Sequence, residues 1–193
     1  MTPLTTRFDD ALTFARIHHN ADVRKGTNIP YVSHLLGVCS LVLDMEGSEN
    51  EAIAALLHDV VEDGGGLRAA AQIREQFGPD VERIVLACSD TFGGPKPPWR
   101  ERKEAYIAAI AHKAPDELRV SLADKLHNVR AIELDLRTLG TKLWDKFNAP
   151  RDCQLWYYGA LADAFAARRD DLGEPTQPAV DTLRRTVDVI GEI

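Results

Sequence analysis

The chain has 193 residues and a net charge of −7, with 45% hydrophobic and 27% charged residues. These values are those of an ordinary globular protein that is long enough to bury a core, and we expect a single domain over residues 1–193. The negative charge argues against a nucleic-acid partner bound through a broad basic surface. A small phosphorylated ligand is compatible with it, because such a ligand needs only a local basic cluster.

The sequence gives no indication of export or of a membrane anchor. The N-terminus lacks the basic and apolar regions of a signal peptide, and the longest apolar stretches, such as residues 35–43, are far below the roughly 18 residues of a membrane span. The three cysteines, Cys39, Cys88 and Cys153, are odd in number and widely spaced, so they indicate neither a metal knuckle nor a disulfide framework. We therefore expect a cytoplasmic protein.

Apolar residues recur with helical spacing from the first helix onward. Phe8 and Ala11 share one face of that helix, and a second helix begins near residue 31. Ser48 and Glu51 have the spacing of a capping box, which predicts that a third helix starts near residue 49. Because glycine readily adopts the backbone conformation that ends a helix, this third helix should end at the three glycines 64–66.

The remaining chain continues this helical pattern. Further helices are expected at residues 69–77, 81–88, 100–113, 117–138, 141–148, 150–171 and 178–191. A turn-rich insert, SDTFGGPKPPWRERK at residues 89–103, is a candidate mobile loop. The sequence predicts an all-α bundle of about eight to ten helices. Its motif-bearing core covers about 7–140, and a helical extension covers about 141–193.

Four titratable residues are crowded into the end of the third helix, within AIAALLHDVVEDGGG at residues 52–66. On a helix, His58, Asp59, Glu62 and Asp63 would lie on one broad face. Three carboxylates so close together repel one another, and carboxylates near a helix C-terminus also oppose the helix dipole. A bound cation removes that cost. The alternative is a solvated acidic helix end, which the apolar run before it disfavours.

Two further residues in apolar surroundings extend this set. His34 lies in IPYVSHLLGV, and Asp124 lies in VSLADKLHNV. Taken singly, His34 is typical of a core histidine and Asp124 is typical of a helix surface. Together with His58 and Asp59 they form a mixed nitrogen and oxygen set on three helices, which suits Mn²⁺ or Fe²⁺. A structural zinc site would more typically use thiolates.

The order H…HD…D on helices resembles the HD-domain metal-dependent phosphohydrolases. Three longer segments, RKGTNIPYVSH, ALLHDVVED and LADKLHNVR, are similar to the (p)ppGpp hydrolase domain of RelA/SpoT homologues, and they occur in order between residues 24 and 130. The chain is too short for the synthetase and regulatory domains of the bifunctional enzymes, so it resembles a stand-alone small alarmone hydrolase. The resemblance implies an HD-domain helical bundle with one divalent ion, Mn²⁺ in the first place and Fe²⁺ as the alternative.

The resemblance also implies a role for each matching residue. The metal ligands would be His34, His58, Asp59 and Asp124. The catalytic acidic pair would be Glu62 and Asp63. The substrate contacts would be Arg24, Lys25, Lys125 and Asn128, together with Arg102 and Lys103 in the insert that borders the site. Without the resemblance, the basic residues of this set would be interpreted as solvated charges at a turn or at an exposed helix start.

Two positions depart from the family pattern. Gly26 stands where the family often has serine after the RK pair, and Ala131 stands where it often has threonine three residues after the asparagine. In the family both positions lie where the base is recognised. Losing two hydroxyls that pair with a purine edge weakens the case for guanine, and it makes an adenine alarmone, (p)ppApp, a serious alternative to (p)ppGpp.

The sequence therefore predicts a metal-dependent enzyme that removes the 3′-pyrophosphate from a purine alarmone. Two alternatives stay open. One is a broader HD-domain nucleotide phosphohydrolase, such as a 5′-nucleotidase or an NADPH phosphatase. The other is a non-catalytic nucleotide-sensing module. The intact acidic pair favours the alarmone enzyme. The expected partner is a small-molecule nucleotide, with neither nucleic acid nor membrane, and the sequence does not decide the oligomeric state.

Overall fold

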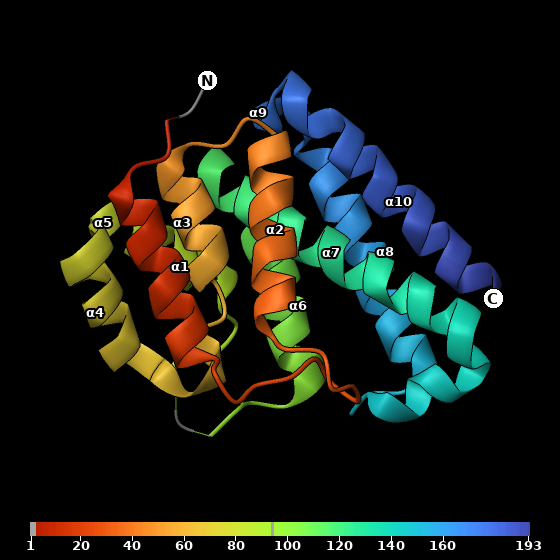
Figure 1. Ribbon diagram of the computed structural model, residues 1–193. Helices are drawn as coiled ribbons and strands as arrows, with labels where there is room; N and C mark the ends of the chain where they lie inside the picture. Colours follow the sequence, from red (N-terminus) through yellow and green to blue (C-terminus); the bar gives the residue numbers. More distant parts are fainter. Residues whose placement is uncertain (1–2, 94) are drawn as a thin grey trace.

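The computed structural model describes residues 3–93 and 95–193, without the side chains at positions 63 and 64. Within these residues the protein consists of α-helices and short 3₁₀ and π turns, with one isolated β-bridge between Val23 and Pro30 and no strand (Figure 1). The all-α prediction is therefore confirmed. The α-helices are α1 (Thr6–His18), α2 (Val32–Asp44), α3 (Glu49–Leu57), α4 (Gly66–Phe77), α5 (Pro79–Cys88), α6 (Trp99–Ile110), α7 (Pro115–Leu139), α8 (Arg151–Ala167), α9 (Arg169–Leu172) and α10 (Gln177–Glu192).

Helix α3 is surrounded by other helices. It contacts α1, α2, α5 and α7, and residues 52–57 are all fully buried. Its start is the predicted capping box, in which Ser48 Oγ accepts from Glu51 N–H at 3.3 Å and Glu51 Oε2 accepts from Ser48 N–H at 2.7 Å. Because residues 52–57 of α3 are apolar and buried, the polar residues that follow them emerge directly from the core.

Helix α3 ends earlier than the sequence analysis predicts. It stops at Leu57, and a π turn (Val61–Gly65) follows after three residues. Gly65 N–H donates to the carbonyl of Val60, five residues back, at 3.2 Å, and a Cβ at Gly65 would lie 2.5 Å from that oxygen. Gly66, at φ +54°, then begins α4. The prediction of one helix ending at the glycines was wrong, because the glycines permit a wide turn and a new helix.

The C-terminal helices pack on α7 and on one another. Figure 1 shows α10 beside α8 and α7, in agreement with the contacts between these elements. The expected helix at 150–171 is interrupted at Arg168, whose guanidinium donates to the carbonyls of Ile110 at 2.7 Å and Lys113 at 3.1 Å. The expected helix at 141–148 is a 3₁₀ turn (Gly140–Lys146). The interruption at Arg168 could not be read from apolar spacing, because the partners of its guanidinium are distant in the sequence.

The long helix α7 brings the motifs of the sequence together. It contacts both α2 and α3, so residues from positions 34, 58 and 124 converge in the interior. None of the described helices is both long enough and apolar enough to cross a membrane.

Candidate metal centre

Four side chains meet where α2, the end of α3 and α7 converge. His34 Nε2 lies 3.5 Å from Asp59 Oδ2 and 3.2 Å from Asp124 Oδ1, and His58 Nε2 lies 3.0 Å and 3.6 Å from the same two atoms. The two imidazoles and Asp124 are buried, and Asp59 is partly exposed. The structure thus brings together all four residues that the sequence analysis proposes as ligands.

Hydrogen bonds fix the orientation of both imidazoles. His58 Nδ1 donates to the Ala55 carbonyl at 2.8 Å, so Nε2 is the nitrogen that faces the two carboxylates. That Nε2 atom is buried and has no hydrogen-bond partner among the described residues. His34 Nδ1 lies 2.9 Å from Nδ1 of His127. Burial, followed by the proximity of His34 and Arg24, lowers the pKa of His127 to about 4, so its neutral ring can accept a hydrogen bond from His34.

The two carboxylates are held in different ways. Asp59 Oδ2 accepts from the Tyr31 hydroxyl at 2.6 Å. Asp124 accepts from Lys125 Nζ and from Asn128 Nδ2, both at 2.6 Å. Burial alone would raise the pKa of Asp124, but Lys125 holds it well below its ordinary value. The sequence analysis places Lys125 and Asn128 at the substrate. In this structure both instead hold Asp124, one of the candidate metal ligands, in position.

Glu62 lies on the π turn that follows the HD pair. Its Oε1 is 3.5 Å from Lys96 Nζ, and its Oε2 accepts weakly from the backbone N–H of Asp90 at 3.5 Å. Burial raises the pKa of Glu62, and the charges of Asp90 and Asp59 raise it further. A carboxylate with a raised pKa is suited to taking up and releasing a proton. The side chain of Asp63 lies outside the described residues, so its role stays a prediction.

Asp90 is a functional candidate that the sequence analysis missed. Its Oδ2 accepts from Arg102 Nη1 at 2.6 Å and from Lys103 Nζ at 2.7 Å. The two basic residues proposed for phosphate contact thus form ion pairs with one carboxylate, which lies beside Glu62. The available signal was an acidic residue directly after α5, followed by a basic cluster in the insert, but their pairing depends on the path of the loop.

A cavity of about 350 Å³ opens beside the centre. Three residues of its wall, Tyr31, His127 and Asn128, each bond to one of the four metal-ligand candidates. Its basic residues are Arg24, Lys25 and Lys146. Arg24 Nη2 donates to Asn128 Oδ1 at 3.0 Å, which joins the cavity wall to Asp124. Lys146 was not singled out from the sequence, because nothing near it in the chain marks a site.

The two positions that depart from the family pattern differ in the structure. Ala131 lines the cavity beside the centre. Gly26 is not among the described lining residues, and it has a φ of +71°, where a Cβ would also lie 2.9 Å from the Lys146 side chain. Glycine at position 26 is therefore explained by its backbone conformation. Of the two positions, Ala131 is the one that lines the cavity.

Comparisons with known proteins identify the family. A family model of the HD domain matches residues 11–152. The chain belongs to the HD-domain family. Guanosine-3′,5′-bis(diphosphate) 3′-pyrophosphohydrolase MESH1 of Drosophila melanogaster is 33% identical over 138 residues, which cover 69% of this chain and 74% of that protein. The Homo sapiens protein of the same name is 34% identical over 124 residues, which cover 63% of this chain and 66% of that protein.

Solved structures of similar proteins share the fold of this HD domain. One, described as a metazoan ortholog of SpoT that hydrolyses ppGpp and plays a role in starvation responses, aligns with a TM-score of 0.73 and 27% identity. The alignment covers 96% of this chain and 97% of that one. A protein of Listeria monocytogenes aligns with a TM-score of 0.70 and 28% identity over 83% of this chain and 99% of its own.

The donor set of this HD domain fits a divalent metal ion. Ligand atoms of His34, His58 and Asp59 all lie within 4.8 Å of one another. The buried Nε2 of His58 lies 3.0 Å and 3.6 Å from oxygens of two carboxylates and makes no hydrogen bond within the described residues, and a bound cation would satisfy all three groups. Nitrogen and oxygen donors without thiolates are typical of Mn²⁺ and Fe²⁺ sites.

Proposed function

We propose that this chain is a metal-dependent pyrophosphohydrolase that removes the 3′-pyrophosphate from a purine alarmone, (p)ppGpp or (p)ppApp. One observation carries the proposal. Three of the four candidate ligands, His34, Asp59 and Asp124, share hydrogen bonds with the wall of a cavity that carries basic residues. Glu62, a carboxylate with a raised pKa, follows three residues after Asp59. The names of the similar proteins point to the same activity.

The cavity beside the centre would hold the nucleotide. Arg24 and Lys25 would offset phosphate charge, and the planar guanidinium of Arg24 can also stack on a base. Its hydrogen bond to Asn128 Oδ1 fixes the guanidinium before substrate arrives. Lys146 adds a third basic side chain to the same wall, where its Nζ lies 3.3 Å from Asp135 Oδ2. Polyphosphate nucleotides are therefore the substrate class that this cavity suits.

His34, His58, Asp59 and Asp124 would hold the divalent ion, which we propose to be Mn²⁺. When bound, such an ion polarises a phosphate oxygen and lowers the pKa of a bound water. The residues around the centre prepare this site, because Tyr31 orients Asp59 and Lys125 with Asn128 orients Asp124. Removal of metal by a chelator should abolish hydrolysis, and Mn²⁺ should restore it better than Mg²⁺.

Glu62 and Asp63 would handle the protons of the reaction. A water oxygen forms a bond to the phosphorus attached to the ribose 3′-oxygen, and the bond between that phosphorus and the 3′-oxygen breaks. One of the two carboxyl groups takes a proton from the water, and the other gives a proton to the departing 3′-oxygen. Arg102 and Lys103, gathered by Asp90, would offset the charge on the released pyrophosphate.

Two variants separate the metal site from the proton transfer. Glu62→Gln keeps the size of the side chain and all four candidate ligands, so it should retain the metal and lose turnover by about 100-fold or more. Asp59→Ala should lose both. Glu75→Gln, an exposed position on α4, is the matched control and should behave as the original protein. Metal content and pyrophosphate release are measured on the same samples. Full activity of Glu62→Gln would contradict the assignment.

A substrate panel tests the reaction itself. Release of pyrophosphate from ppGpp and pppApp, measured side by side, should exceed phosphate release from NADPH and from nucleoside monophosphates. Preference for NADPH or a monophosphate would instead support a broader nucleotide phosphohydrolase. Binding of alarmone without any release of pyrophosphate would support a sensor.

A further inference from the structure

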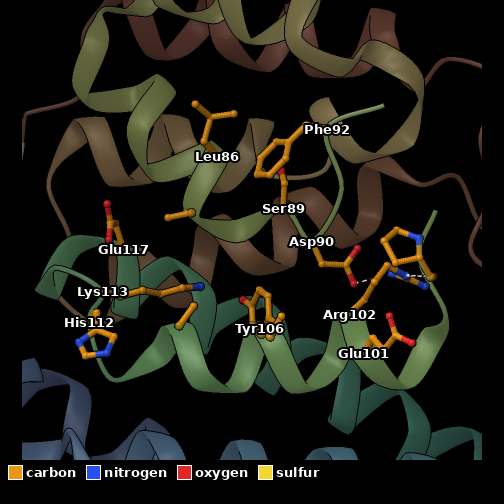
Figure 2. A pocket seen from close by; sticks show the side chains of 14 residues that line it. Leu86, Ser89, Asp90, Phe92, Glu101, Arg102, Tyr106, His112, Lys113 and Glu117 are labelled. Atoms are coloured by element: carbon orange, nitrogen blue, oxygen red, sulfur yellow. Dashed lines mark hydrogen bonds and ion pairs between the residues drawn. The ribbon is translucent and has the colours of Figure 1, made fainter. Parts of the chain in front are cut away.

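A second cavity lies between α5 and α6, away from the nucleotide cavity. Its volume is about 670 Å³, within the range of small-molecule sites, and it shares no lining residue with the cavity at Arg24. Figure 2 shows the side chains that line it, with α6 along one side. Much of the wall is apolar and comes from Leu86, Phe92, Ala105 and Ala109. A ligand with an apolar body would fit this wall.

The inner end of this cavity holds a buried ammonium group. Lys113 is 6% exposed, and Figure 2 shows its side chain reaching along the cavity toward Tyr106. Its Nζ donates to Ser121 Oγ at 2.9 Å and lies 4.1 Å from the centroid of the Tyr106 ring. Among the described residues, no carboxylate oxygen lies within 4.0 Å of this Nζ. A buried cation without an anionic partner is costly, and burial lowers the pKa of Lys113 to about 8.

Two further groups make this end of the cavity specific. The Tyr106 hydroxyl is buried and has no hydrogen-bond partner among the described residues. The segment that carries Lys113 is held in place by Arg168, which donates to the backbone carbonyls of Ile110 and Lys113. An ammonium and a phenol are thus present together on a fixed backbone, and both can donate to the same acceptor.

The charges around the cavity restrict the kind of acceptor. Glu101 and Glu117 line its rim, and Asp90 lines the end that is near Glu62. Arg83 is paired with Glu117, and Arg102 is paired with Asp90. Three carboxylates, on Asp90, Glu101 and Glu117, outnumber Arg102 at the rim, so a nucleotide polyphosphate is attracted less here than to the cavity at Arg24. A single negative charge placed at Lys113 matches this distribution.

We propose that this cavity binds a monocarboxylic acid with an aliphatic body, whose carboxylate accepts hydrogen bonds from Lys113 Nζ and from the Tyr106 hydroxyl. The carboxylate supplies the anionic partner that the ammonium lacks, and the aliphatic chain covers the apolar wall of α5 and α6. Asp90 and Arg102 of the proposed hydrolase site also line this cavity. The contacts proposed for the carboxylate, at Lys113 and Tyr106, use neither residue, so occupancy does not require the hydrolase activity.

Calorimetric titration of the full chain with decanoate, in the absence of nucleotide, tests the proposal. We expect saturable binding with one site per chain. Lys113→Met should weaken it about tenfold or more, the loss expected for one hydrogen bond to a charged group. Lys142→Met, at an exposed lysine, is the control and should bind normally. Decanol should bind the original protein more weakly than decanoate does. Equal decanoate affinity of Lys113→Met, or no saturable binding at millimolar decanoate, would overturn the proposal.

A second variant keeps the test decisive if Lys113→Met does not fold. Tyr106→Phe retains the ring and removes only the unpartnered hydroxyl, and it should weaken decanoate binding several-fold. Unchanged affinity would argue against the proposed geometry. Glu62→Gln should bind decanoate as the original protein does. The two proposals can therefore fail independently, because decanoate binding is measured without hydrolysis.

Discussion

Lys125, which is partly buried, and Lys113, which is buried, face the same aromatic ring and differ in their partners. Their Nζ atoms lie 4.6 Å and 4.1 Å from the centroid of Tyr106. Burial lowers the pKa of either ammonium, but Asp124, at 2.6 Å, holds the pKa of Lys125 well above its ordinary value. Without such a carboxylate, the pKa of Lys113 falls to about 8. A carboxylate partner, more than the depth of burial, decides the charge of each lysine. The ammonium group that lacks such a partner is the one that can bind an anion.

Removing the paired lysine should have the largest effect. Lys125→Met leaves the buried Asp124 carboxylate without its ammonium partner, and breaking a buried pair costs about 3–5 kcal/mol of unfolding free energy. Urea unfolding of the metal-free protein measures this loss, and metal affinity should fall with it. Lys113→Met is the matched comparison and should cost much less, because it strands no carboxylate. Equal losses of unfolding free energy in the two variants would show that the carboxylate partner of Lys125 makes no difference.

The pH dependence of stability should reveal the unpaired lysine. The pKa of Lys113 is lowered from 10.5 to about 8, so the folded state binds fewer protons than the unfolded state between these values. The stability that comes from the neutral amine is fully present above pH 10.5 and is lost as the pH falls through 8. Relative to Lys113→Met, the stability of the original protein should therefore fall by about 3 kcal/mol between pH 10.5 and pH 7. Urea unfolding at several pH values checks it, with Lys142→Met as the control. A constant difference would contradict the shift.

The smallest expected effect is a change in the preference for guanine or adenine in the substrate. Ala131→Thr adds a hydroxyl to the nucleotide cavity and should shift the ratio of kcat/KM for ppGpp over pppApp by several-fold, about 1 kcal/mol. Decanoate binding in the other cavity should not change. Gly26→Ser is an instructive contrast, because at φ +71° it should mainly weaken the loop rather than change base preference. If Gly26→Ser changed the ratio and Ala131→Thr did not, the base would lie elsewhere than the cavity indicates.

Helical spacing and the motifs were sufficient to predict the all-α fold and the convergence of His34, His58, Asp59 and Asp124. The break after Leu57 was not predictable from spacing, because a π turn needs the same glycines that usually end a helix. Ion pairs between residues distant in the sequence could not be predicted from the sequence either. Asp90 binds Arg102 and Lys103 only because the path of the insert brings its two ends together.

The lining of the two cavities was equally unavailable from the chain alone. Nothing next to Lys146 in the sequence marks it as a cavity residue. Lys113 looks like an ordinary lysine in a turn before a proline, and its burial depends on α5, α6 and Arg168.

The burial of α3 on all sides has a consequence for the order of folding. Its neighbours α1, α2, α5 and α7 extend from Thr6 to Leu139, so enclosing it requires contacts between segments far apart in the chain. Such contacts form late, since loop closure must precede them. His58 and Asp59 directly follow α3, so the metal-binding geometry arises only once the core is assembled. In refolding experiments, metal uptake should therefore follow the recovery of helical signal instead of initiating it, unlike in small domains whose folding is driven by the metal.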